Sequence, residues 1–415
     1  MIQTPRYSQD GLRWSRQLWN TVPHWTRQPS VSSIENVCRQ QLKIQPKDPC
    51  QISFYAVGAF NRLYRVECLA QTFIMRVTLP VYPYHKTHGE VTTLNWLRHK
   101  TTIPVPKIIA FDDSRSNEIG FEWILIEFMP GCQARRKWRT MTKEQKVALT
   151  ERIAEIQAEL FRCGSENDKF KNIGTLHWNH GNIDGEASTA PVPGELVCHE
   201  FFLDNRLQFD FPRGPFQSSG AWLESIIKVI ILEKTAIIEE AKDDDDVEDE
   251  QDILIPTQRL LSILPKYFPP AEEGYAEPTV LYHPDLNLRN ILVDDEGKIT
   301  AIVDWECVSA LPIWMTLNVP HFLEEDDRLE EPVREDYGDE TPSEAAAAAD
   351  TGDPDRLDNE GKNPLYWEHL MEYEATQLRD VYRTKLKQLW PEWPMRGDYD
   401  FRHPGIGNML ISAGP

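Results

Sequence analysis

Residues 279–306 read TVLYHPDLNLRNILVDDEGKITAIVDWE, and this stretch carries the clearest indications of structure and chemistry in the chain. It predicts a strand (TVLY), a loop (HPDLNLR), a second strand (NILVD), a turn (DEGK) and a third strand (ITAIVDW). Gly297 lies at the centre of the turn. A hairpin that pairs symmetrically about Gly297 places Asn290 opposite Asp304, directly after the loop that carries Asp285. The sequence therefore predicts that three oxygen-bearing side chains converge on one small volume.

These three side chains suit one kind of chemistry. A carboxylate and an amide that face each other are ligands for a hard cation such as Mg²⁺. A further carboxylate one loop away can orient a hydroxyl group and accept its proton. Phosphoryl transfer requires this set of groups. Any one of the three residues alone is better explained as a loop or capping residue, so the prediction depends on their combination.

HPDLNLRNILVD followed by IVDWE resembles the catalytic and metal-binding segments of the aminoglycoside phosphotransferase and choline-kinase-like family, in particular its fungal branch. The resemblance extends upstream through GAFNRLYRV, FIMRVTL, HGEVTTLNWL, ILIEFMPG, IGTLHW and RGPFQSS. It implies an α+β, two-lobed protein-kinase-like fold, with a small antiparallel sheet in one lobe and a mostly helical second lobe. It also implies that ATP, with Mg²⁺, donates its γ-phosphoryl group to a hydroxyl of an unidentified small-molecule acceptor.

The resemblance implies roles for four residues of the central stretch. Asp285 matches the catalytic base, and Asn290 and Asp304 match the Mg²⁺ ligands. His283 matches the histidine that opens the catalytic loop, where its role is architectural. After Asp304 the sequence continues WECVSALPIW and lacks the Asp-containing continuation of bacterial members.

Further residues match the parts of the family that hold the nucleotide. Gly58 and Asn61 lie in what resembles the phosphate-covering loop, and Glu127, Phe128 and Met129 match the hinge whose backbone pairs with adenine. The strand position that normally supplies a phosphate-binding lysine is Arg76, and its expected partner is Glu90. Arginine is longer and planar, so the two cations are not interchangeable. The alternative is that Arg76 and Glu90 form an ordinary surface ion pair.

The pattern of elements divides the chain into five segments. Three strand-like runs, a helix at 88–100 and two more strand-like runs form an expected N-lobe, and further helices are expected around 142–164, 220–241, 251–264 and 365–390. The predicted segments are an extension of no assigned role (1–45), the N-lobe (46–129), a C-lobe with an acidic insertion at 239–250 (130–323), an acidic segment expected to be disordered (324–363), and a C-terminal helix with a tail (364–415).

The net charge of the 415 residues is −22, and two segments carry almost all of it. Residues 239–250 hold nine acids and one base, and residues 324–360 hold sixteen acids and three bases. Such runs are typical of solvated loops. A chain with this balance has no electrostatic reason to bind nucleic acid. The most apolar window, 221–238, contains four charged residues, so no membrane span is predicted.

Seven cysteines occur singly and favour a reducing compartment, so we expect a cytoplasmic protein. Three arginines and one acid in the first 16 residues leave a mitochondrial presequence open. Two alternatives to a small-molecule kinase remain. One is a kinase-like binding or scaffold protein without catalysis, and the other is a protein kinase, which the absence of DFG and APE sequences disfavours. The oligomeric state stays open.

Overall fold

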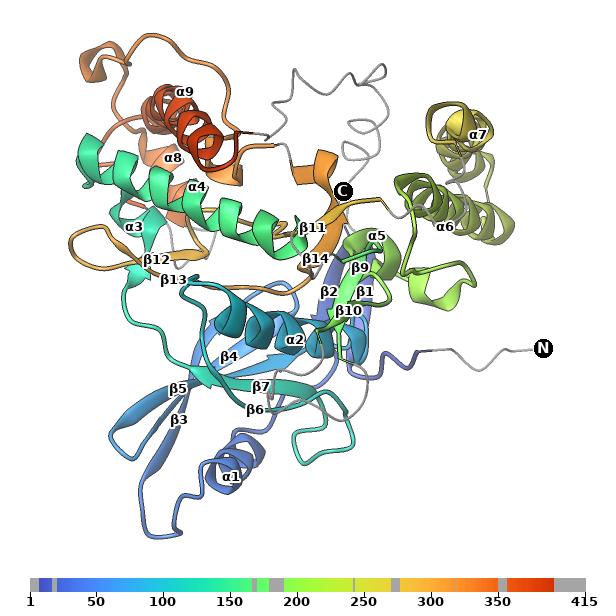
Figure 1. The fold of residues 1–415 in the computed structure, drawn as a ribbon, viewed down its shortest axis with the longest axis horizontal. Helices are drawn as coiled ribbons and strands as arrows, with labels where there is room; N and C mark the ends of the chain where they lie inside the picture. Colours follow the sequence, from blue (N-terminus) through green and yellow to red (C-terminus); the bar gives the residue numbers. More distant parts are fainter. Residues whose placement is uncertain are drawn as a thin grey trace.

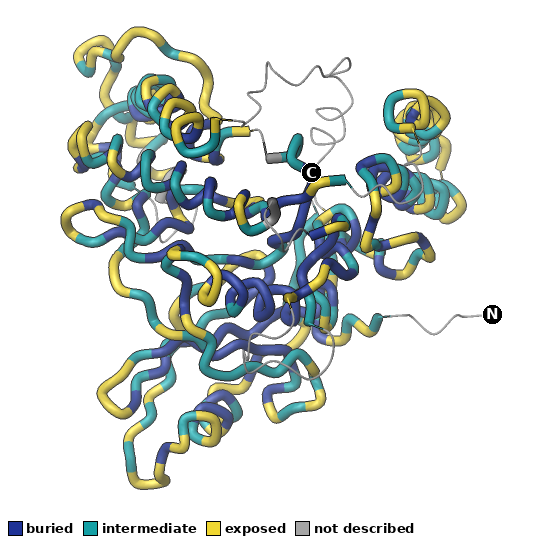
Figure 2. The backbone as a smooth tube through the Cα atoms, viewed as in Figure 1, coloured by how far each residue is buried: buried dark blue, intermediate teal, exposed yellow. Residues whose placement is uncertain are grey.

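The computed structural model describes residues 7–16, 21–165, 170–178, 190–241, 243–269, 277–316, 318–349 and 357–391. The described chain forms two lobes, a β-rich lobe at the bottom of Figure 1 and a mostly helical lobe above it. Buried residues lie inside both lobes and where the two lobes meet (Figure 2). The α+β, two-lobed, protein-kinase-like architecture expected from the sequence is confirmed.

A five-stranded antiparallel sheet forms the N-lobe, with strand order β3-β4-β5-β7-β6. Its strands are β3 (Cys50–Val57), β4 (Asn61–Cys68), β5 (Gln71–Thr78), β6 (Ile108–Asp112) and β7 (Glu122–Glu127). The predicted series of three strands, a helix and two strands is therefore confirmed. Helix α1 (Val31–Gln41) packs on the sheet through Ile34, Val37 and Cys38.

Helix α2 (His85–Lys100) lies between the N-lobe sheet and the C-lobe (Figure 1). Its residues from Lys86 to Leu94 are all buried, polar ones included, and so are Trp96 and Leu97. The helix includes the predicted segment 88–100 and begins three residues earlier. Charged side chains on a buried part of a helix are costly unless each has an ion-pair or hydrogen-bond partner. The buried charged residues of α2 are therefore expected to take part in ion pairs.

The N-terminal hairpin lies against both lobes and consists of β1 (Leu12–Arg16) and β2 (Thr21–Trp25). Leu12, Trp14 and Trp25 pack on an apolar cluster that joins N-lobe residues to C-lobe residues such as Phe202. Arg16 Nε donates to Asp204 Oδ2 at 2.7 Å. The segment expected as an extension is therefore packed into the molecule where the structure describes it.

Helices dominate the C-lobe, whose main core lies between α4 (Lys143–Ser165), α9 (Pro364–Leu389) and the strand β11 (Thr279–Tyr282). The remaining helices are α3 (Ala134–Trp138), α5 (His199–Phe202), α6 (Ser219–Glu240), α7 (Asp244–Tyr267) and α8 (Pro342–Ala349), with 3₁₀ turns η1 (Arg206–Gln208), η2 (Ile313–Thr316), η3 (His321–Leu323) and η4 (Arg334–Asp336). The expected helices, including the C-terminal one, are confirmed, and residues 392–415 lie outside the described part. None of the helices in the described ranges is long and apolar enough to span a membrane.

Two small sheets position the central stretch of sequence. One has the order β10-β9-β14-β11 and the other the order β13-β12-β8. Their further strands are β8 (Cys132–Gln133), β9 (Gly174–His177), β10 (Val192–Pro193), β12 (Ile291–Val293), β13 (Ile299–Ile302) and β14 (Ser309–Pro312). The three strands predicted within 279–306 are present as β11, β12 and β13.

The register of the β12–β13 hairpin differs from the symmetric one. Ile291 pairs with Ile302, a bulge follows Leu292, and the N–H of Val303 donates to the carbonyl of Asn290 at 2.9 Å. The prediction that Asn290 lies directly opposite Asp304 is therefore wrong by one residue. The cause is the centre of the turn, because Asp294 pairs with Lys298 and Val293 with Ile299, which centres the turn on Glu296 and not on Gly297. The bulge after Leu292 restores only half of that shift.

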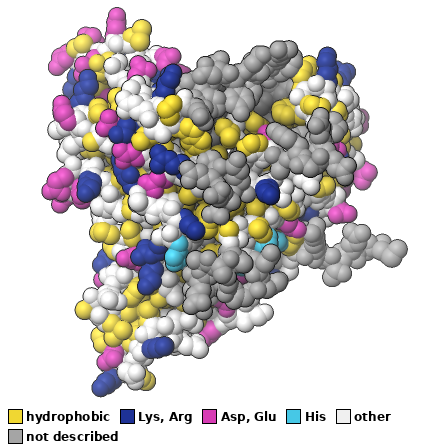
Figure 3. All heavy atoms as spheres, in the orientation of Figure 1, with side chains coloured by type: hydrophobic (Ala, Val, Ile, Leu, Met, Phe, Trp, Pro, Cys, Tyr) yellow, Lys and Arg dark blue, Asp and Glu magenta, His cyan; other side chains and the backbone are white. Residues whose placement is uncertain are grey.

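The first acidic run was expected to be a loop, and that expectation is wrong for residues 244–250, which form the first turns of α7. Asp243 caps the helix, because its Oδ1 accepts the N–H of Asp246 at 3.0 Å. Carboxylates in a first turn interact favourably with the helix dipole, so a run of acids can begin a helix. On the face shown in Figure 3, acidic side chains gather at the edges of the molecule.

The second acidic segment was expected to be disordered, which is wrong for its described parts, 324–349 and 357–363. It contains η4 and α8 and crosses α9, where Arg328 Nε donates to Glu372 Oε2 at 2.7 Å. Arg379 of α9 donates to the carbonyls of Leu323 and Glu325 at 2.8 and 2.6 Å. These arginine contacts offset part of the negative charge of the segment and hold its backbone against α9. Residues 350–356 lie outside the described part.

Candidate active site

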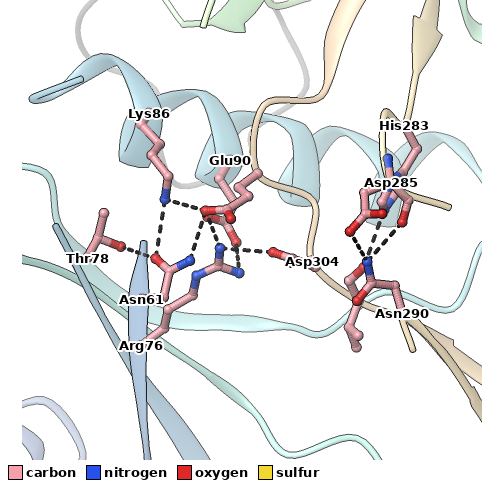
Figure 4. A network of polar contacts seen from close by, with 11 residues as sticks. Asn61, Arg76, Thr78, Lys86, Glu90, His283, Asp285, Asn290 and Asp304 are labelled. Carbon is pink, nitrogen blue, oxygen red and sulfur yellow. Dashed lines mark hydrogen bonds and ion pairs between the residues drawn. The ribbon is translucent and has the colours of Figure 1, made fainter. Parts of the chain in front are cut away.

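Asp285 lies in the loop between β11 and β12, and two amides hold its carboxylate. Asn290 Nδ2 donates to its Oδ2 at 2.8 Å and to its carbonyl at 2.9 Å, and Asn287 Nδ2 donates to its Oδ1 at 2.5 Å (Figure 4). Its side chain is 51% exposed, and His321 Nδ1 lies 3.9 Å from Oδ1. The carboxylate is thus fixed in direction and open to an incoming molecule.

His283 joins this loop to the end of β13. It is buried, its ring lies against Trp305 with the centroids 4.8 Å apart, and its Nε2 lies 3.3 Å from the carbonyl of Val303. Its Nδ1 accepts the N–H of Asp285 at 3.2 Å, which assigns the ring proton to Nε2. Burial lowers the pKa of His283 to about 4. A neutral ring that fixes two backbones has a structural role.

Asp304 follows β13 with φ 63°, a left-handed conformation that is uncommon for residues other than glycine. Its Oδ1 accepts a hydrogen bond from Arg76 Nη2 at 3.0 Å, and its side chain is 35% exposed. The bond between Val303 and Asn290 places Asp304 one residue from the Asp285–Asn290 pair, and Figure 4 shows it between that pair and Arg76. The structure therefore brings the three predicted residues together despite the shifted register.

Arg76 on β5 pairs with Glu90 on α2, with 3.0 Å between Nη1 and Oε1. Both side chains are buried, at 7% and 3% exposure, so the alternative of a surface ion pair is wrong. Arg76 Nη2 also reaches Asp304 and, at 2.6 Å, Oε2 of Glu306. Burial opposes its charge, but the three carboxylates outweigh burial and raise the pKa of Arg76. Burial raises the pKa of Glu90.

Two charged residues of this network were missed by the sequence analysis. Lys86 on α2 is 1% exposed and forms an ion pair with Glu306. Burial alone would raise the pKa of Glu306, but Lys86 and Arg76 outweigh it and hold that pKa below its usual range. A signal was present in both cases: Lys86 precedes Glu90 by one helical turn on the same face, and Glu306 lies two residues after Asp304.

Asn61 connects the turn after β3 to this network. It is 3% exposed, its Nδ2 donates to Glu306 Oε2 at 2.9 Å, and its Oδ1 accepts from Thr78 Oγ1 at 2.8 Å and from Lys86 Nζ at 3.2 Å. Gly58 lies in the same turn, where its N–H donates to the carbonyl of Asn61 at 2.9 Å. A Cβ on Gly58 would meet no atom within 4 Å, so no contact in the structure requires glycine there.

The predicted hinge lies apart from the network. Glu127 ends β7, and its Oε2 accepts the N–H of Lys107 at 3.2 Å. Phe128 packs against Tyr55 of β3, with ring centroids 6.0 Å apart, and Met129 is half-buried. Within the described ranges, no hydrogen bond or ion pair joins these hinge residues to Arg76 or Asp304. The structure thus places Glu127 and Met129 at the junction of the lobes without testing a contact with adenine.

The oxygen donors of this site fit Mg²⁺. Among the described residues the Nδ2 of Asn290 and the Oδ1 of Asp304 are engaged, so Asn290 Oδ1 and Asp304 Oδ2 are the oxygens that could bind a metal. Mg²⁺ is commonly bound by one or two protein oxygens together with phosphates and water. Glu90, which shares the partner Arg76 with Asp304, has a buried oxygen, Oε2, without a hydrogen-bond partner among the described residues. Asn290 and Asp304 could therefore hold the metal.

A family model described as the phosphotransferase enzyme family matches residues 51–348. A subtelomeric hrmA-associated cluster protein of Aspergillus fumigatus is 26% identical over 326 residues, which are 68% of this chain and 62% of that protein. Altered inheritance of mitochondria protein 9, mitochondrial, of Saccharomyces cerevisiae is 23% identical over 368 residues, 76% of this chain and 57% of that protein. The chain thus spans about three fifths of the length of the curated relatives it matches.

Solved structures with a similar course of the chain include two of aminoglycoside phosphotransferases. A putative aminoglycoside phosphotransferase from Ralstonia eutropha is 14% identical, with a TM-score of 0.42, over 86% of this chain and 81% of its own. An aminoglycoside phosphotransferase in complex with gentamicin is 12% identical, with a TM-score of 0.42, over 93% of this chain and 95% of its own.

Proposed function

The chain belongs to the phosphotransferase enzyme family, and from that premise we propose that it transfers the γ-phosphoryl group of ATP to a hydroxyl of a small molecule. One observation carries the proposal. A half-exposed carboxylate, Asp285, is held by the amides of Asn287 and Asn290, and Asp304 lies beside this pair. This arrangement provides a base for a hydroxyl next to ligands for a metal that accompanies phosphates.

Asp285 performs the proton chemistry. Its carboxylate accepts a hydrogen bond from the acceptor hydroxyl, aims that oxygen and takes its proton as the new bond to the γ-phosphorus forms, the bond from that phosphorus to the bridging oxygen breaks, and ADP leaves. Asn287 and Asn290 keep the carboxylate from rotating, so little reorganisation is needed during the reaction. His283 fixes the backbone of the same loop through Asp285 N–H and the carbonyl of Val303.

Asn290 and Asp304 would hold Mg²⁺, which would offset phosphate charge. Arg76 keeps Asp304 in place and balances its charge. The hinge, Glu127 to Met129, offers backbone groups to adenine, and the turn with Gly58 and Asn61 covers the phosphates.

Thermal unfolding with ATP and Mg²⁺ tests this function, with the Asp304→Ala variant measured alongside. A ligand at 100 times its Kd stabilises a protein by about 2.7 kcal/mol, which is readily visible. We expect a stabilisation that needs Mg²⁺ and is lost in the variant. No stabilisation of the wild-type protein at millimolar nucleotide would instead support the alternative, a kinase-like binding or scaffold protein without catalysis.

The location of the protein is also a proposal. The single cysteines favour the cytoplasm, whereas the printed name of the yeast relative includes the word mitochondrial and the first 16 residues are basic. We propose the cytoplasm, with the mitochondrion as the alternative. Fractionation of cells that express the tagged full chain distinguishes the two, because co-purification with mitochondria would contradict the cytoplasmic assignment.

A further inference from the structure

We propose that Lys86 on α2 is the cation that contacts the phosphates of the nucleotide, and that Arg76 instead braces the acidic side chains of the site. This inference rests on the proposed function. It gives Lys86 the phosphate-binding role that the family resemblance assigns to the strand position occupied by Arg76. Three observations carry it: the three carboxylates that bind the terminal nitrogens of Arg76, the spare donor of Lys86, and the shape of the site that the two share with Asn61.

The two terminal nitrogens of Arg76 are bound to three carboxylates, and its buried Nε has no hydrogen-bond partner within the described ranges. Its Nη1 binds Glu90 at 3.0 Å, and its Nη2 binds both Asp304 at 3.0 Å and Glu306 at 2.6 Å. These carboxylates come from α2 and from the segment after β13, so the guanidinium ties the N-lobe to the C-lobe. A buried planar group with three anionic partners cannot turn toward a ligand without leaving one of those charges unpaired, which is costly.

Within the described ranges Lys86 has one carboxylate partner where Arg76 has three, and its ammonium has a donor to spare. Its ammonium carries three N–H groups. Within the described ranges they have two oxygen acceptors, Glu306 Oε2 and Asn61 Oδ1, the latter at 3.2 Å. A lysine on a flexible stem can move between neighbouring oxygens, whereas an arginine fork is bound to one geometry. Lys86 can therefore add a contact to a phosphate oxygen while it keeps a protein partner.

The surroundings of Lys86 already form an anion site. Three N–H donors from three N-lobe elements converge on the single oxygen Glu306 Oε2: Asn61 Nδ2 of β4 at 2.9 Å, Arg76 Nη2 of β5 at 2.6 Å, and Lys86 Nζ of α2. Figure 4 shows Asn61, Arg76 and Lys86 side by side. Convergence of charged donors on one anionic oxygen is the arrangement that holds phosphate. Asn61 begins the strand directly after the proposed phosphate-covering turn, so phosphates under that turn lie next to Lys86.

Calorimetric binding of ADP and of adenosine to the full chain tests the proposal, using Lys86→Met and Lys86→Gln. The glutamine can still donate a hydrogen bond to Glu306 without carrying a charge, so it protects the test if the methionine variant does not fold. Lys146→Met is the matched control. Lys146 is also a buried lysine paired with a glutamate, because its Nζ lies 2.5 Å from Glu374 Oε1 in the C-lobe.

We expect the Lys86 variants to bind ADP about tenfold to hundredfold more weakly than the wild-type protein and to bind adenosine unchanged, because one charged hydrogen bond to phosphate is lost. Lys146→Met should leave both affinities as they are. A folded Lys86 variant that binds ADP normally, or that loses ADP and adenosine in equal proportion, would overturn the proposal. A wild-type protein that binds neither ligand would refute the proposed function as well, so the two failures are distinguishable.

Discussion

The asparagine neighbours of Asp285 fix the orientation of its carboxylate and do not supply charge, since their two neutral amides bind both of its oxygens. Asp285→Asn keeps the shape of the side chain and removes its capacity to accept a proton. We expect turnover with any acceptor to fall by about a hundredfold to ten-thousandfold, the range of a general base. Stabilisation by nucleotide should persist.

Asp295→Asn is the control for that variant. Asp295 is a carboxylate of the neighbouring turn with a 96% exposed side chain that pairs with Lys137. It should retain full turnover. Full activity in Asp285→Asn would remove Asp285 from the reaction.

The burial of Glu122 leads us to expect that the stability of the protein depends on pH. It is 2% exposed on β7 and accepts the N–H of Tyr84 at 2.7 Å. Burial raises its pKa to about 7, despite hydrogen bonds from Thr87 and Tyr84 and the nearby charge of Lys86. Since the folded state holds this proton more tightly than the unfolded chain, its contribution is complete below about pH 4.5 and is lost as the pH rises through 7.

The difference between the two pKa values corresponds to about 3 kcal/mol of stability lost by pH 8. Glu122→Gln should therefore lose less stability than the wild-type protein between pH 5 and pH 8. Urea unfolding at several pH values measures both curves. Parallel curves for the two proteins would show that Glu122 does not titrate in this range.

Sequence reasoning at this scale found Asp285, Asn290, Asp304, Arg76 and Glu90 and missed Lys86 and Glu306. The five matched a known motif or an expected partner. Lys86 and Glu306 belong to the network only through a contact between the two lobes. They are 220 positions apart in the sequence and form their ion pair when α2 packs near the segment that follows β13. Spacing on one helix relates Lys86 to Glu90, but it does not show which carboxylate of the other lobe will face it.

The β12–β13 hairpin sets the position of Asp304, and Gly297 sets the hairpin. Gly297 has φ 81°, and a Cβ there would lie 3.0 Å from Met141 Cε. Gly297→Ala should lower the free energy of unfolding by about 1–2 kcal/mol, because alanine is strained in the left-handed region. Denaturant unfolding measures the change.

Gly338→Ala provides the comparison for Gly297. Gly338 has no positive φ, and a Cβ there would meet no atom within 4 Å. Its substitution should change the free energy of unfolding by less than about 0.5 kcal/mol. Equal losses in the two variants would show that the turn geometry is not what makes Gly297 necessary.

The helices and strands were predicted better than their exact ends and the register of their pairing. Alternation and apolar spacing identified the five N-lobe strands and the long helices, because those patterns report which face is buried. Composition misjudged 244–250, since acids that disfavour a helix interior stabilise its first turn. The register of one hairpin was also missed, because its turn is centred one residue before Gly297 and a bulge follows, and alternating side chains reveal neither.

The N-terminal hairpin joins the two lobes. Trp14 packs near Phe60, with ring centroids 6.5 Å apart, in a cluster that also includes Phe202 of the C-lobe. Trp14→Ala should lower the free energy of unfolding by about 2 kcal/mol or more, since a large ring leaves a cluster that spans both lobes. Calorimetry and urea unfolding report the loss.

Leu329→Ala is the control for Trp14, because Leu329 is 83% exposed and its removal opens no cavity. Its stability should match that of the wild-type protein. A wild-type stability in Trp14→Ala would mean that the hairpin does not hold the lobes together. The sequence alone assigned this segment no role, because the partners of a short hairpin lie far away along the chain.

Helix α2 has consequences for how this chain can change over generations. With every residue from Lys86 to Leu94 enclosed, the helix has little free surface on which neutral substitutions could accumulate. At Gly89 even a methyl group would collide with Thr175 of β9. A larger residue at 89 can therefore be inherited only together with a smaller one at 175, so descendants of this chain should vary at the two positions as a pair.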